Sequence, residues 1–501
     1  MSIPKLVAQN SFWKDPELIE EDKYIQNWEA SPFKWWPRLI ETIDWNIDLL
    51  YTLRGPRQVG KTTLLKLKIR DLIKREVIDA RRIFYWSCDL VENPEKLVSL
   101  ITEYMDWIGS PSKERVYIFL DEISSVRDWQ RGVKFLYDSG KLRNCTLIMT
   151  GSHSIDIRKA SESLAGRRGQ VDRLADKLPD KILLPMKFSE YAETRSKEIY
   201  EVLRKFFLLM PQRRKLLLEQ LLQGNMPNEF KELLLYSKEL ELLLQEYLIT
   251  GGVPKAISKY VSHGSITEDV YNDYTNLVIR DILRWGGREA YLRQVLHQVI
   301  KTVASQVSWA EFAKETDLGS HNTVAVYMDI LKDAFVVSIM YCLDKNSGRP
   351  LYRKNKKVHF LDPFIFHSLR AWALGIEPFS STLEFLKEAE NRSKLIECVV
   401  GNHLIRFLFN LFPSPRFEYN NKIFYWESEK KREVDFVAKI NTEYLPIEVK
   451  YQPSIQTSNA YGIIDFTKSG QSHHGLIISK DNLEVKRSYV TIPCYIFLLL
   501  A

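Results

Sequence analysis

The stretch LRGPRQVGKTTLLKLK, residues 53–68, constrains the fold of this 501-residue chain more than any other part of it. It contains the pattern G-x-x-x-x-G-K-[ST], whose glycines let the backbone turn its N–H groups toward the oxygens of a phosphate. An apolar run at 49–53 precedes the loop, and good helix formers follow it. A helix that begins at the loop presents free N–H groups and the positive end of its dipole to an anion. The sequence therefore predicts a buried strand, a phosphate-binding loop and a helix, in that order.

The residues of this loop are expected to bind ATP or ADP together with Mg²⁺. Lys61 can reach the β- and γ-phosphates, and the hydroxyl of Thr62 can bind Mg²⁺. The alternative is a glycine-rich loop that matches the pattern by chance, which the flanking strand and helix argue against. The expected nucleotide-binding residues are Gly55, Pro56, Arg57, Gln58, Val59, Gly60, Lys61, Thr62 and Thr63.

A second apolar run, at 116–120, ends in two acidic residues. Asp121 is expected to bind Mg²⁺ with Thr62, either directly or through water, and Glu122 is expected to polarise the water that attacks the γ-phosphate. The alternative is a buried strand whose acidic end is only solvated. The phosphate-binding loop upstream favours the metal-binding interpretation.

Two further segments carry candidate catalytic groups. A hydroxyl after the apolar run at 145–149 can hold the attacking water or sense the γ-phosphate; Ser152 is the first candidate and Thr150 the second. Ordinary turn chemistry explains the same residues. The loop LAGRRGQ, 164–170, offers Arg167 and Arg168, either of which can act as an arginine finger, with Arg167 as our candidate; a solvated basic loop is the alternative. The expected catalytic residues are Lys61, Asp121, Glu122, Ser152 and Arg167.

These motifs resemble those of AAA+-type P-loop ATPases, and more narrowly the archaeal and bacterial ATPases that join such a core to a poorly characterised C-terminal domain. The resemblance runs from about Trp35 to the end of the chain. It implies ATP binding and hydrolysis, and a helical lid after the core. It rests on GPRQVGKTT at 55–63, IFLDEIS at 118–124, TGSHS at 150–154, LAGR at 164–167, LLPMKFSEY at 183–191, YLITGGVPKAI at 247–257 and IRDIL at 279–283.

The pattern of apolar segments predicts an α/β protein with several domains. Strand candidates at 49–54, 82–87, 116–120, 145–150 and 181–184 alternate with helices, which favours a parallel sheet with helices on both faces. The phosphates would then lie beyond the carboxyl ends of the strands. We expect a tryptophan-rich N-terminal arm at 1–40 that packs on the core, with an aromatic base-stacking surface as the alternative. The P-loop AAA+ core follows at 41–195, and the helical lid at 196–285.

Residues 286–370 predict a winged helix. Two helices separated by a turn at 317–319 are followed by a basic β-hairpin that includes Lys357. The start of the second helix would face base edges and the hairpin would face phosphates, so DNA is the expected partner. The alternative is a winged helix that only packs against protein. The candidate DNA contacts are His321, Asn322, Thr323, Arg353, Lys354 and Lys356.

Residues 385–501 resemble the P-D-(D/E)-x-K fold of restriction-endonuclease-like domains. Asp435 and Glu448 would bind Mg²⁺ or Mn²⁺, Lys450 would lie on the same strand face as Glu448, and Glu397 would complete the metal shell from a helix. Val434 stands where the usual proline precedes the first acid. Ordinary half-buried strands with alternating charged residues are the alternative. The terminal run YIFLLLA is predicted to be a core strand, since it is too short to span a bilayer.

Composition sets broader bounds. A formal net charge of +7 permits nucleic-acid binding but does not require it. Five scattered cysteines without a C-x-x-C pair, and a start without a long apolar segment, favour the cytoplasm and no membrane association. An arginine finger that acts on a neighbouring copy would require a homo-oligomer, and a monomeric switch is the alternative. A nucleotide-switched scaffold whose C-terminal domains only bind partners is the alternative to a DNA-associated ATPase.

Overall fold

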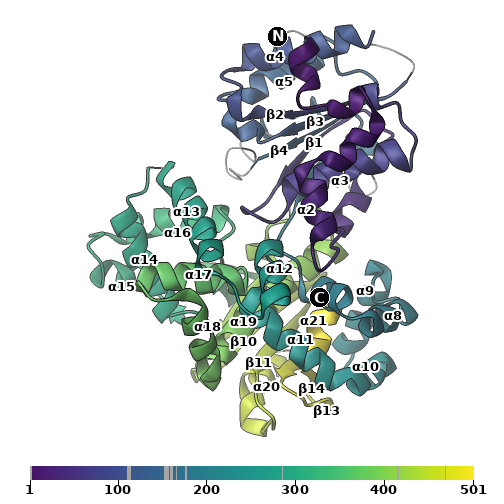
Figure 1. Ribbon diagram of the computed structural model, residues 1–501. Helices are drawn as coiled ribbons and strands as arrows, with labels where there is room; N and C mark the ends of the chain where they lie inside the picture. The colour runs from purple at the N-terminus through teal and green to yellow at the C-terminus, as the bar shows by residue number, and fades with distance from the viewer. Residues whose placement is uncertain are drawn as a thin grey trace. The chain divides into compact units, whose positions relative to one another are not determined.

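The computed structural model describes residues 3–109, 114–151, 157, 162–164, 166–174, 178–284, 286–414, 417–468 and 470–501. The chain divides into two compact units, Met1–Leu184 and Pro185–Ala501, which are described separately (Figure 1). The last residues of the predicted core, 185–195, therefore belong with the second unit. No helix of the described residues is both long enough and apolar enough to cross a membrane.

The first unit is built on a parallel sheet of five strands in the order β2-β3-β4-β1-β5. Every residue of β3 and β4 is buried, as expected for strands that are covered on both faces. The parallel α/β core predicted from the sequence is confirmed. The strands are β1 (Leu49–Arg54), β2 (Ile83–Ser87), β3 (Val116–Asp121), β4 (Cys145–Thr150) and β5 (Asp180–Ile182).

Helices cover both faces of this sheet because the chain reverses its direction across it. The crossover from β1 to β2 passes over β4 and β3, whereas β2, β3 and β4 follow one another in the opposite direction. Right-handed crossovers therefore place α3 (Lys61–Lys74) on one face, and α4 (Pro94–Trp107) and α5 (Trp129–Asp138) on the other (Figure 1). The phosphate-binding loop lies at the carboxyl end of β1.

The N-terminal arm packs on the core, as predicted. The side-chain amide of Asn10 donates to Tyr85 O at 3.0 Å and accepts from Tyr85 N at 2.8 Å, so it occupies backbone groups of the edge strand β2. Trp13 stacks on Phe84 and Tyr104. The arm therefore protects a sheet edge that would otherwise be open to pairing. It comprises α1 (Ile3–Val7), two short 3₁₀ helices (Ser11–Trp13 and Pro16–Glu21) and α2 (Lys23–Ala30).

The second unit begins with a long helical stretch, as the leucine spacing predicts. The helices are α7 (Phe188–Arg195), α8 (Lys197–Lys205), α9 (Pro211–Leu222), α10 (Asn228–Leu233), α11 (Ser237–Thr250), α12 (Pro254–His263) and α13 (Glu268–Arg284). The next elements are α14 (Glu289–Lys301), β6 (Gln306–Val307), α15 (Trp309–Lys314), α16 (His321–Asp333), β7 (Val337–Asp344) and β8 (Arg349–Phe360).

A mixed sheet of nine strands forms the rest of this unit, in the order β13-β14-β12-β11-β10-β9-β7-β8-β6. The β7–β8 hairpin joins the C-terminal strands through a parallel bridge between Cys342 and Tyr425. The remaining strands are β9 (Ile423–Glu427), β10 (Glu433–Ile440), β11 (Glu443–Lys450), β12 (Gly475–Ser479), β13 (Glu484–Val485) and β14 (Tyr489–Pro493). The remaining α-helices are α17 (Pro363–Leu374), α18 (Pro378–Lys387), α19 (Ala389–Leu411), α20 (Tyr461–Thr467) and α21 (Cys494–Leu500).

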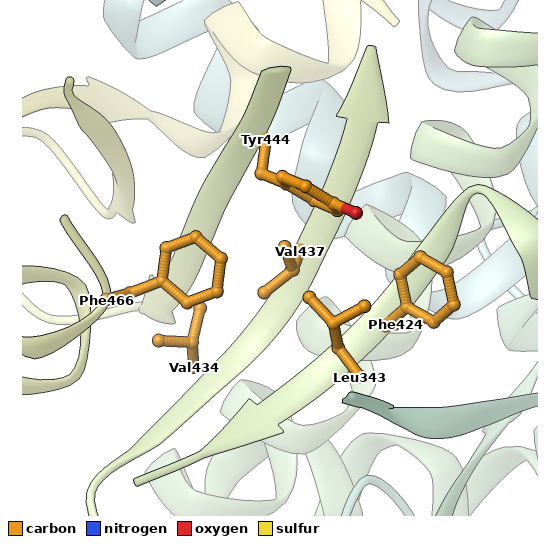
Figure 2. Close-up of a cluster of buried hydrophobic side chains, with 6 residues drawn as sticks. All are labelled: Leu343, Phe424, Val434, Val437, Tyr444 and Phe466. Atoms are coloured by element: carbon orange, nitrogen blue, oxygen red, sulfur yellow. The ribbon is translucent and has the colours of Figure 1, made fainter. Parts of the chain in front are cut away.

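A bulge in β10 separates a polar group from a buried apolar cluster. Val434 pairs with Trp426 and Val437 with Phe424, so two residues of β10 oppose one residue of β9. The bulge turns Val434 and Val437 to the same side, while Asp435 lies between them. Figure 2 shows the cluster that results, made of Leu343, Phe424, Val434, Val437, Tyr444 and Phe466.

The predicted C-terminal strand is wrong: residues 494–500 form the helix α21. All of its residues are buried, and it packs against α7 and α19. A short apolar run fits a fully buried helix as well as it fits a buried strand, because neither exposes a polar face. The preceding residues, Tyr489–Pro493, form the actual strand, and Pro493 ends it.

Candidate functional site

Two glycines give the phosphate-binding loop its shape. Gly55 has φ +155°, and a Cβ atom there would lie 2.0 Å from the carbonyl oxygen of Leu183. Gly60 has φ +94° and precedes the first turn of α3. A side chain is excluded at the first position by contact and is strained at the second by its backbone conformation.

Lys61 and Thr62 begin α3 and point into the loop region. The Lys61 ammonium donates to Gly55 O at 3.0 Å and to Pro56 O at 2.9 Å. The Thr62 hydroxyl donates to Asp121 Oδ2 at 2.7 Å. The structure therefore brings the two predicted metal ligands together, although they lie on different elements. Hydroxyl and carboxylate oxygens are the donors that Mg²⁺ prefers, so this pair fits the ion.

Asp121 is surrounded by hydroxyl groups. Its side chain is 3% exposed, and besides Thr62 it accepts from the hydroxyls of Tyr85, at 3.0 Å, and Thr150. Burial and the negative charge of Asp121 raise the pKa of the Tyr85 phenol, so this group stays a donor. Three O–H donors from three elements thus fix the orientation of one carboxylate. Tyr85 was missed in the sequence analysis. The only signal was that it lies near the end of β2, the strand next to β3.

A buried lysine supports this arrangement from α3. The Lys66 ammonium lies 3.1 Å from Asp22 Oδ2 and 3.3 Å from the centre of the Tyr85 ring. Burial lowers the pKa of Lys66, and the charge of Asp22 opposes that change. The N-terminal arm therefore contributes a carboxylate to the surroundings of the nucleotide site, which the sequence did not reveal.

The predicted base, Glu122, has a left-handed backbone with φ +52°. Its N–H donates to the Thr150 hydroxyl at 3.2 Å, and that hydroxyl donates in turn to Asp121. Thr150 therefore joins the two acidic residues. Such a conformation is uncommon for a residue with a side chain and is typical of functional sites. Ser152, the other hydroxyl candidate, lies outside the described residues.

The two candidate finger arginines lie away from this site. Arg167 pairs with Asp138 at 2.8 Å, and Arg168 with Asp180 at 3.0 Å. The backbone carbonyl of Arg168 accepts from Leu50 N, at the start of β1. This is the amino end of β1, roughly 17 Å along the strand from Gly55. The Arg168 guanidinium pairs with Asp180, which lies beside Thr52 in the middle of β1. The described geometry does not bring either arginine to the loop of its own chain.

A second polar cluster lies in the other unit, around Lys357 of β8. Its ammonium lies 2.7 Å from Glu397 Oε1, 2.5 Å from Glu433 Oε1 and 2.9 Å from Asp435 Oδ1. Lys357 was predicted to belong to a basic, phosphate-binding hairpin, which is wrong, because its side chain is 2% exposed. A run of basic residues on a strand does not show which of their side chains point into the protein and which point to solvent.

Glu448 and Lys450 complete this cluster on β11. Lys450 Nζ lies 2.6 Å from Glu448 Oε1 and 3.8 Å from Asp435 Oδ2. Burial opposes ionisation of Asp435, but the charges of Lys357 and Lys450 outweigh it and hold the pKa of Asp435 below its usual range. Burial and the charge of Asp435 raise the pKa of Glu448. The four residues predicted as a nuclease site are thus brought together, and both lysines are engaged with their acids.

The cluster borders a cleft of about 530 Å³. Gln306 of β6 donates to Glu433 Oε2 at 2.8 Å and to Glu427 Oε2 at 3.2 Å, and His359 lies 3.2 Å from Glu397. Among the described residues, no group of three histidine, cysteine, aspartate or glutamate side chains is arranged to hold a metal ion. Gln306, His359, Glu427 and Glu433 were all missed in the sequence.

The candidate DNA contacts fall into two groups. His321 and Asn322 are exposed at the start of α16, and Arg353 and Lys354 are exposed on β8, whereas Thr323 is half-buried. Lys356 is buried: its ammonium donates to Lys354 O at 2.9 Å and lies over the Trp309 ring. Burial lowers the pKa of Lys356. Lys356 is therefore less available to a phosphate than its neighbours.

Three family models match parts of the chain. Residues 48–192 match the AAA_14 family, described as an AAA domain. Residues 241–379 and 392–497 match two families described as domains of unknown function, DUF8612 and DUF4143. The first match agrees with the five-stranded parallel sheet and the loop at its centre. This part of the chain is similar to an AAA domain.

Two curated proteins are similar to the chain. An uncharacterized protein of Methanocaldococcus jannaschii is 27% identical over 69% of this chain and 64% of its own length, so the chain spans slightly less than two thirds of that relative. An uncharacterized protein of Haemophilus influenzae is 21% identical over 87% of each.

Solved structures give weak similarities. The Orc1 protein of Aeropyrum pernix in complex with DNA is 13% identical, with 74% of this chain and 97% of that chain covered and a TM-score of 0.28. A RuvB variant of Thermotoga maritima is 16% identical, with 64% and 88% covered and a TM-score of 0.25. Cdc6p of Pyrobaculum aerophilum is 12% identical, with 72% and 94% covered and a TM-score of 0.21. Scores this low carry no argument about this chain.

Proposed function

We propose that this protein binds ATP with Mg²⁺ at residues 55–63 and hydrolyses it, and that its second unit binds DNA. The observation that carries the first part is the 2.7 Å contact between Thr62 and Asp121 beside the Lys61 ammonium. It joins a hydroxyl and a carboxylate, from two elements, at the end of a phosphate-binding loop. The AAA-domain match over residues 48–192 supports the same conclusion.

Each residue of the site has one role in the proposed reaction. Lys61 neutralises the β- and γ-phosphates, and Thr62 and Asp121 hold the Mg²⁺ ion that bridges them. Glu122 orients and polarises the attacking water. Thr150 holds Glu122 next to Asp121 through its hydroxyl. An arginine finger, if Arg167 provides one, acts on a second copy of the chain, since its place on this sheet is far from the loop.

Substitution of Lys61 and Glu122 separates binding from hydrolysis. Lys61→Ala should abolish ATP turnover, because it removes the charge that neutralises the phosphates. Glu122→Gln should bind ATP with similar affinity and lose at least about a hundredfold in kcat, in keeping with the loss of a general base. Fluorescent-nucleotide binding and phosphate release measure the two effects.

Exposed residues of the same types serve as controls for this experiment. Lys96→Ala and Glu92→Gln change an exposed ion pair at the start of α4 and should leave both binding and turnover unchanged. Normal turnover in Lys61→Ala would show that hydrolysis occurs elsewhere. Normal turnover in Glu122→Gln would remove Glu122 from its proposed role.

The DNA-binding part of the proposal concerns residues 286–370. The order α14, β6, α15, α16, β7, β8 supports a winged helix, in which α16 would be the recognition helix and the β7–β8 hairpin would be the wing. The exposed His321 and Asn322 would face bases, and the exposed Arg353 and Lys354 would face phosphates. We further propose that residues 196–285 act as a lid, whose closure on ATP changes how the second unit meets DNA.

Arg353→Ala combined with Lys354→Ala tests the wing. DNA binding should weaken for every sequence, and the salt slope of log K should fall by about two, because two phosphate contacts are lost. Fluorescence anisotropy with labelled duplexes at several salt concentrations measures both. The control pair Lys238→Ala and Lys387→Ala removes exposed charge elsewhere in the unit. An equal loss of DNA affinity in both pairs would contradict a role of the wing and would indicate a general electrostatic attraction of the unit to DNA.

A nucleotide-switched scaffold is the second candidate function. One observation favours it: both lysines of the acidic cluster in the second unit are bound to its carboxylates, which suits a structural role. Under this function ATP binding would change the conformation while turnover stays slow. DNA that neither binds nor stimulates hydrolysis would favour the scaffold over the DNA-associated ATPase.

A further inference from the structure

Lys357 stands at the centre of the acidic cluster in the second unit. An ammonium group has three N–H donors, and this one has three carboxylate acceptors within 2.9 Å: Glu397, Glu433 and Asp435. Two of the acceptors come from β10 and one from α19. Each of the three N–H donors of the ammonium can therefore bind one carboxylate, and no donor is left over for another acceptor.

The contacts of Lys357 use the oxygens that a metal ion would need. In the predicted nuclease site, Glu397 and Asp435 both bind the divalent ion. Here Glu397 Oε1 and Asp435 Oδ1 each lie within hydrogen-bond distance of the same Nζ atom. The remaining oxygen of Asp435 accepts from Val449 N at 2.9 Å. A second ammonium, from Lys450, is bound to Glu448.

Electrostatics explains why the cluster needs a cation. Several carboxylates buried close together repel one another and favour either protonation or a positive partner. A divalent ion meets this need in a two-metal nuclease. Lys357 meets it here, and it is fixed in place because its strand pairs with β6 and β7 through Gln306 and Met340.

We propose that the Lys357 ammonium is the built-in cation of this cluster and takes the place of a divalent metal ion. The residues present do not fit a metal ion while Lys357 remains among them, so no cleavage step follows from this cluster. Its function is instead to fasten the β7–β8 hairpin to β10 and α19. This inference concerns the second unit alone and does not depend on ATP hydrolysis in the first.

Metal titration tests the proposal directly. The wild-type chain without nucleotide should show no Mn²⁺ bound at the cluster by electron paramagnetic resonance, and Asp121→Ala removes any signal from the nucleotide site. Lys357→Ala should bind Mn²⁺ at least about tenfold more tightly than the wild type, because three carboxylates lose their cation. The same variant should unfold at a lower temperature in EDTA and recover with Mn²⁺. Lys387→Ala, which removes an exposed lysine at the end of α18, is the control.

The wild-type measurement decides the proposal even if Lys357→Ala does not fold. Mn²⁺ bound by the wild type, retained in Asp121→Ala and lost in Asp435→Ala, would overturn it. So would cleavage of linear, circular or single-stranded DNA with Mg²⁺ or Mn²⁺ that Asp435→Ala abolishes. Lys357→Gln combined with Glu433→Gln removes one charge of each sign and provides a second folded background. An affinity for Mn²⁺ in that double variant no greater than in the wild type would also contradict the proposal.

Discussion

At the scale of single residues, the nucleotide site depends on how one carboxylate is held. Asp121 accepts from Thr62, Tyr85 and Thr150, which come from α3, β2 and β4. Each hydroxyl restricts the carboxylate to one orientation. In the role proposed for Asp121, a carboxylate held in this way would need little reorganisation on binding the ion, which is the condition for efficient electrostatic catalysis.

Tyr85→Phe tests this role with the smallest possible change. It removes only the phenol oxygen that donates to Asp121, so ATP turnover should fall about tenfold, as expected for a hydrogen bond to a charged group worth about 1.5–3 kcal/mol. The KM for ATP should change less than kcat. Steady-state kinetics at saturating Mg²⁺ measures both values. Tyr104→Phe, whose hydroxyl instead contacts Arg81 O, should retain full activity; an equal loss in both variants would point to a general loss of packing.

Local patterns in the sequence predicted some of these residues and missed others. Thr62 and Asp121 were found because each belongs to a motif with a fixed position relative to a strand. Tyr85 was missed and Lys357 was assigned to a phosphate-facing hairpin, because the contacts of each depend on a neighbouring strand or on a distant helix. A single sequence does not show which elements, far apart along the chain, lie next to each other in the fold.

At the scale of elements, buried polar groups fasten the helices of the second unit. His403 of α19 accepts from Phe188 N at 2.9 Å through Nε2, so its proton lies on Nδ1, which donates to Val399 O. His367 of α17 donates to Leu248 O at 3.0 Å. Burial lowers the pKa of His403 well below its usual value and that of His367 to about 3. Both imidazoles are therefore neutral in the folded protein.

These two histidines should make the second unit sensitive to acid. Their pKa values are lower in the folded than in the unfolded state, so their stabilising contribution is complete above about pH 6.5 and is lost as the pH falls toward 3. Each should cost about 1.4 kcal/mol of unfolding free energy per pH unit below that value. Asp362, whose pKa burial raises to about 6, and Glu448, whose pKa burial and the charge of Asp435 raise to about 8, act with the opposite sign, since their contribution is lost as the pH rises. The net slope is therefore smaller than that of the two histidines alone, and the share of His367 is measured by its own variant.

Urea unfolding between pH 7.5 and 5 measures this dependence. His367→Gln should reduce the slope of the unfolding free energy against pH by about one proton, since glutamine keeps a donor for Leu248 O but does not titrate. His263→Gln, which changes an exposed histidine of α12, should leave the slope unchanged. A slope that is the same in all three proteins would show that the acid sensitivity arises from other groups.

The fold at this scale was largely predictable, with two failures. The strands β1 to β4 lie close to their predicted positions because each is mostly apolar, whereas β5, at Asp180–Ile182, overlaps only part of the segment predicted at 181–184. The C-terminal run was assigned to the wrong kind of element, because α21 is apolar on every side. The nine-stranded sheet was not foreseen either, since a bridge between Cys342 and Tyr425 joins two predicted domains into one.

At the scale of the whole molecule, the chain divides into two compact units. The first contains the proposed nucleotide site, and the second contains the acidic cluster and the β7–β8 hairpin. A ligand stabilises only the unit that it binds, by an amount set by its concentration relative to its Kd.

Calorimetry should therefore resolve two unfolding transitions. ATP with Mg²⁺ should raise the midpoint of one of them, by about 2.7 kcal/mol of unfolding free energy at a hundredfold excess over Kd. Lys61→Ala should abolish that shift, and His367→Gln should move only the other transition. A single transition that both changes affect equally would mean that the two units unfold together.

The position of Arg167 and Arg168 has a consequence for symmetry. The Arg168 backbone lies at the amino end of β1, and the phosphate-binding loop lies at its carboxyl end. If an arginine of one copy serves the nucleotide of the next, the amino ends of one set of strands must come near the carboxyl ends of the other. Two copies that lie side by side and antiparallel meet this condition across a twofold axis, and each then serves the other. Copies stacked head to tail meet it as well, and they close into a ring or continue as a filament in which only the terminal copy lacks a neighbour.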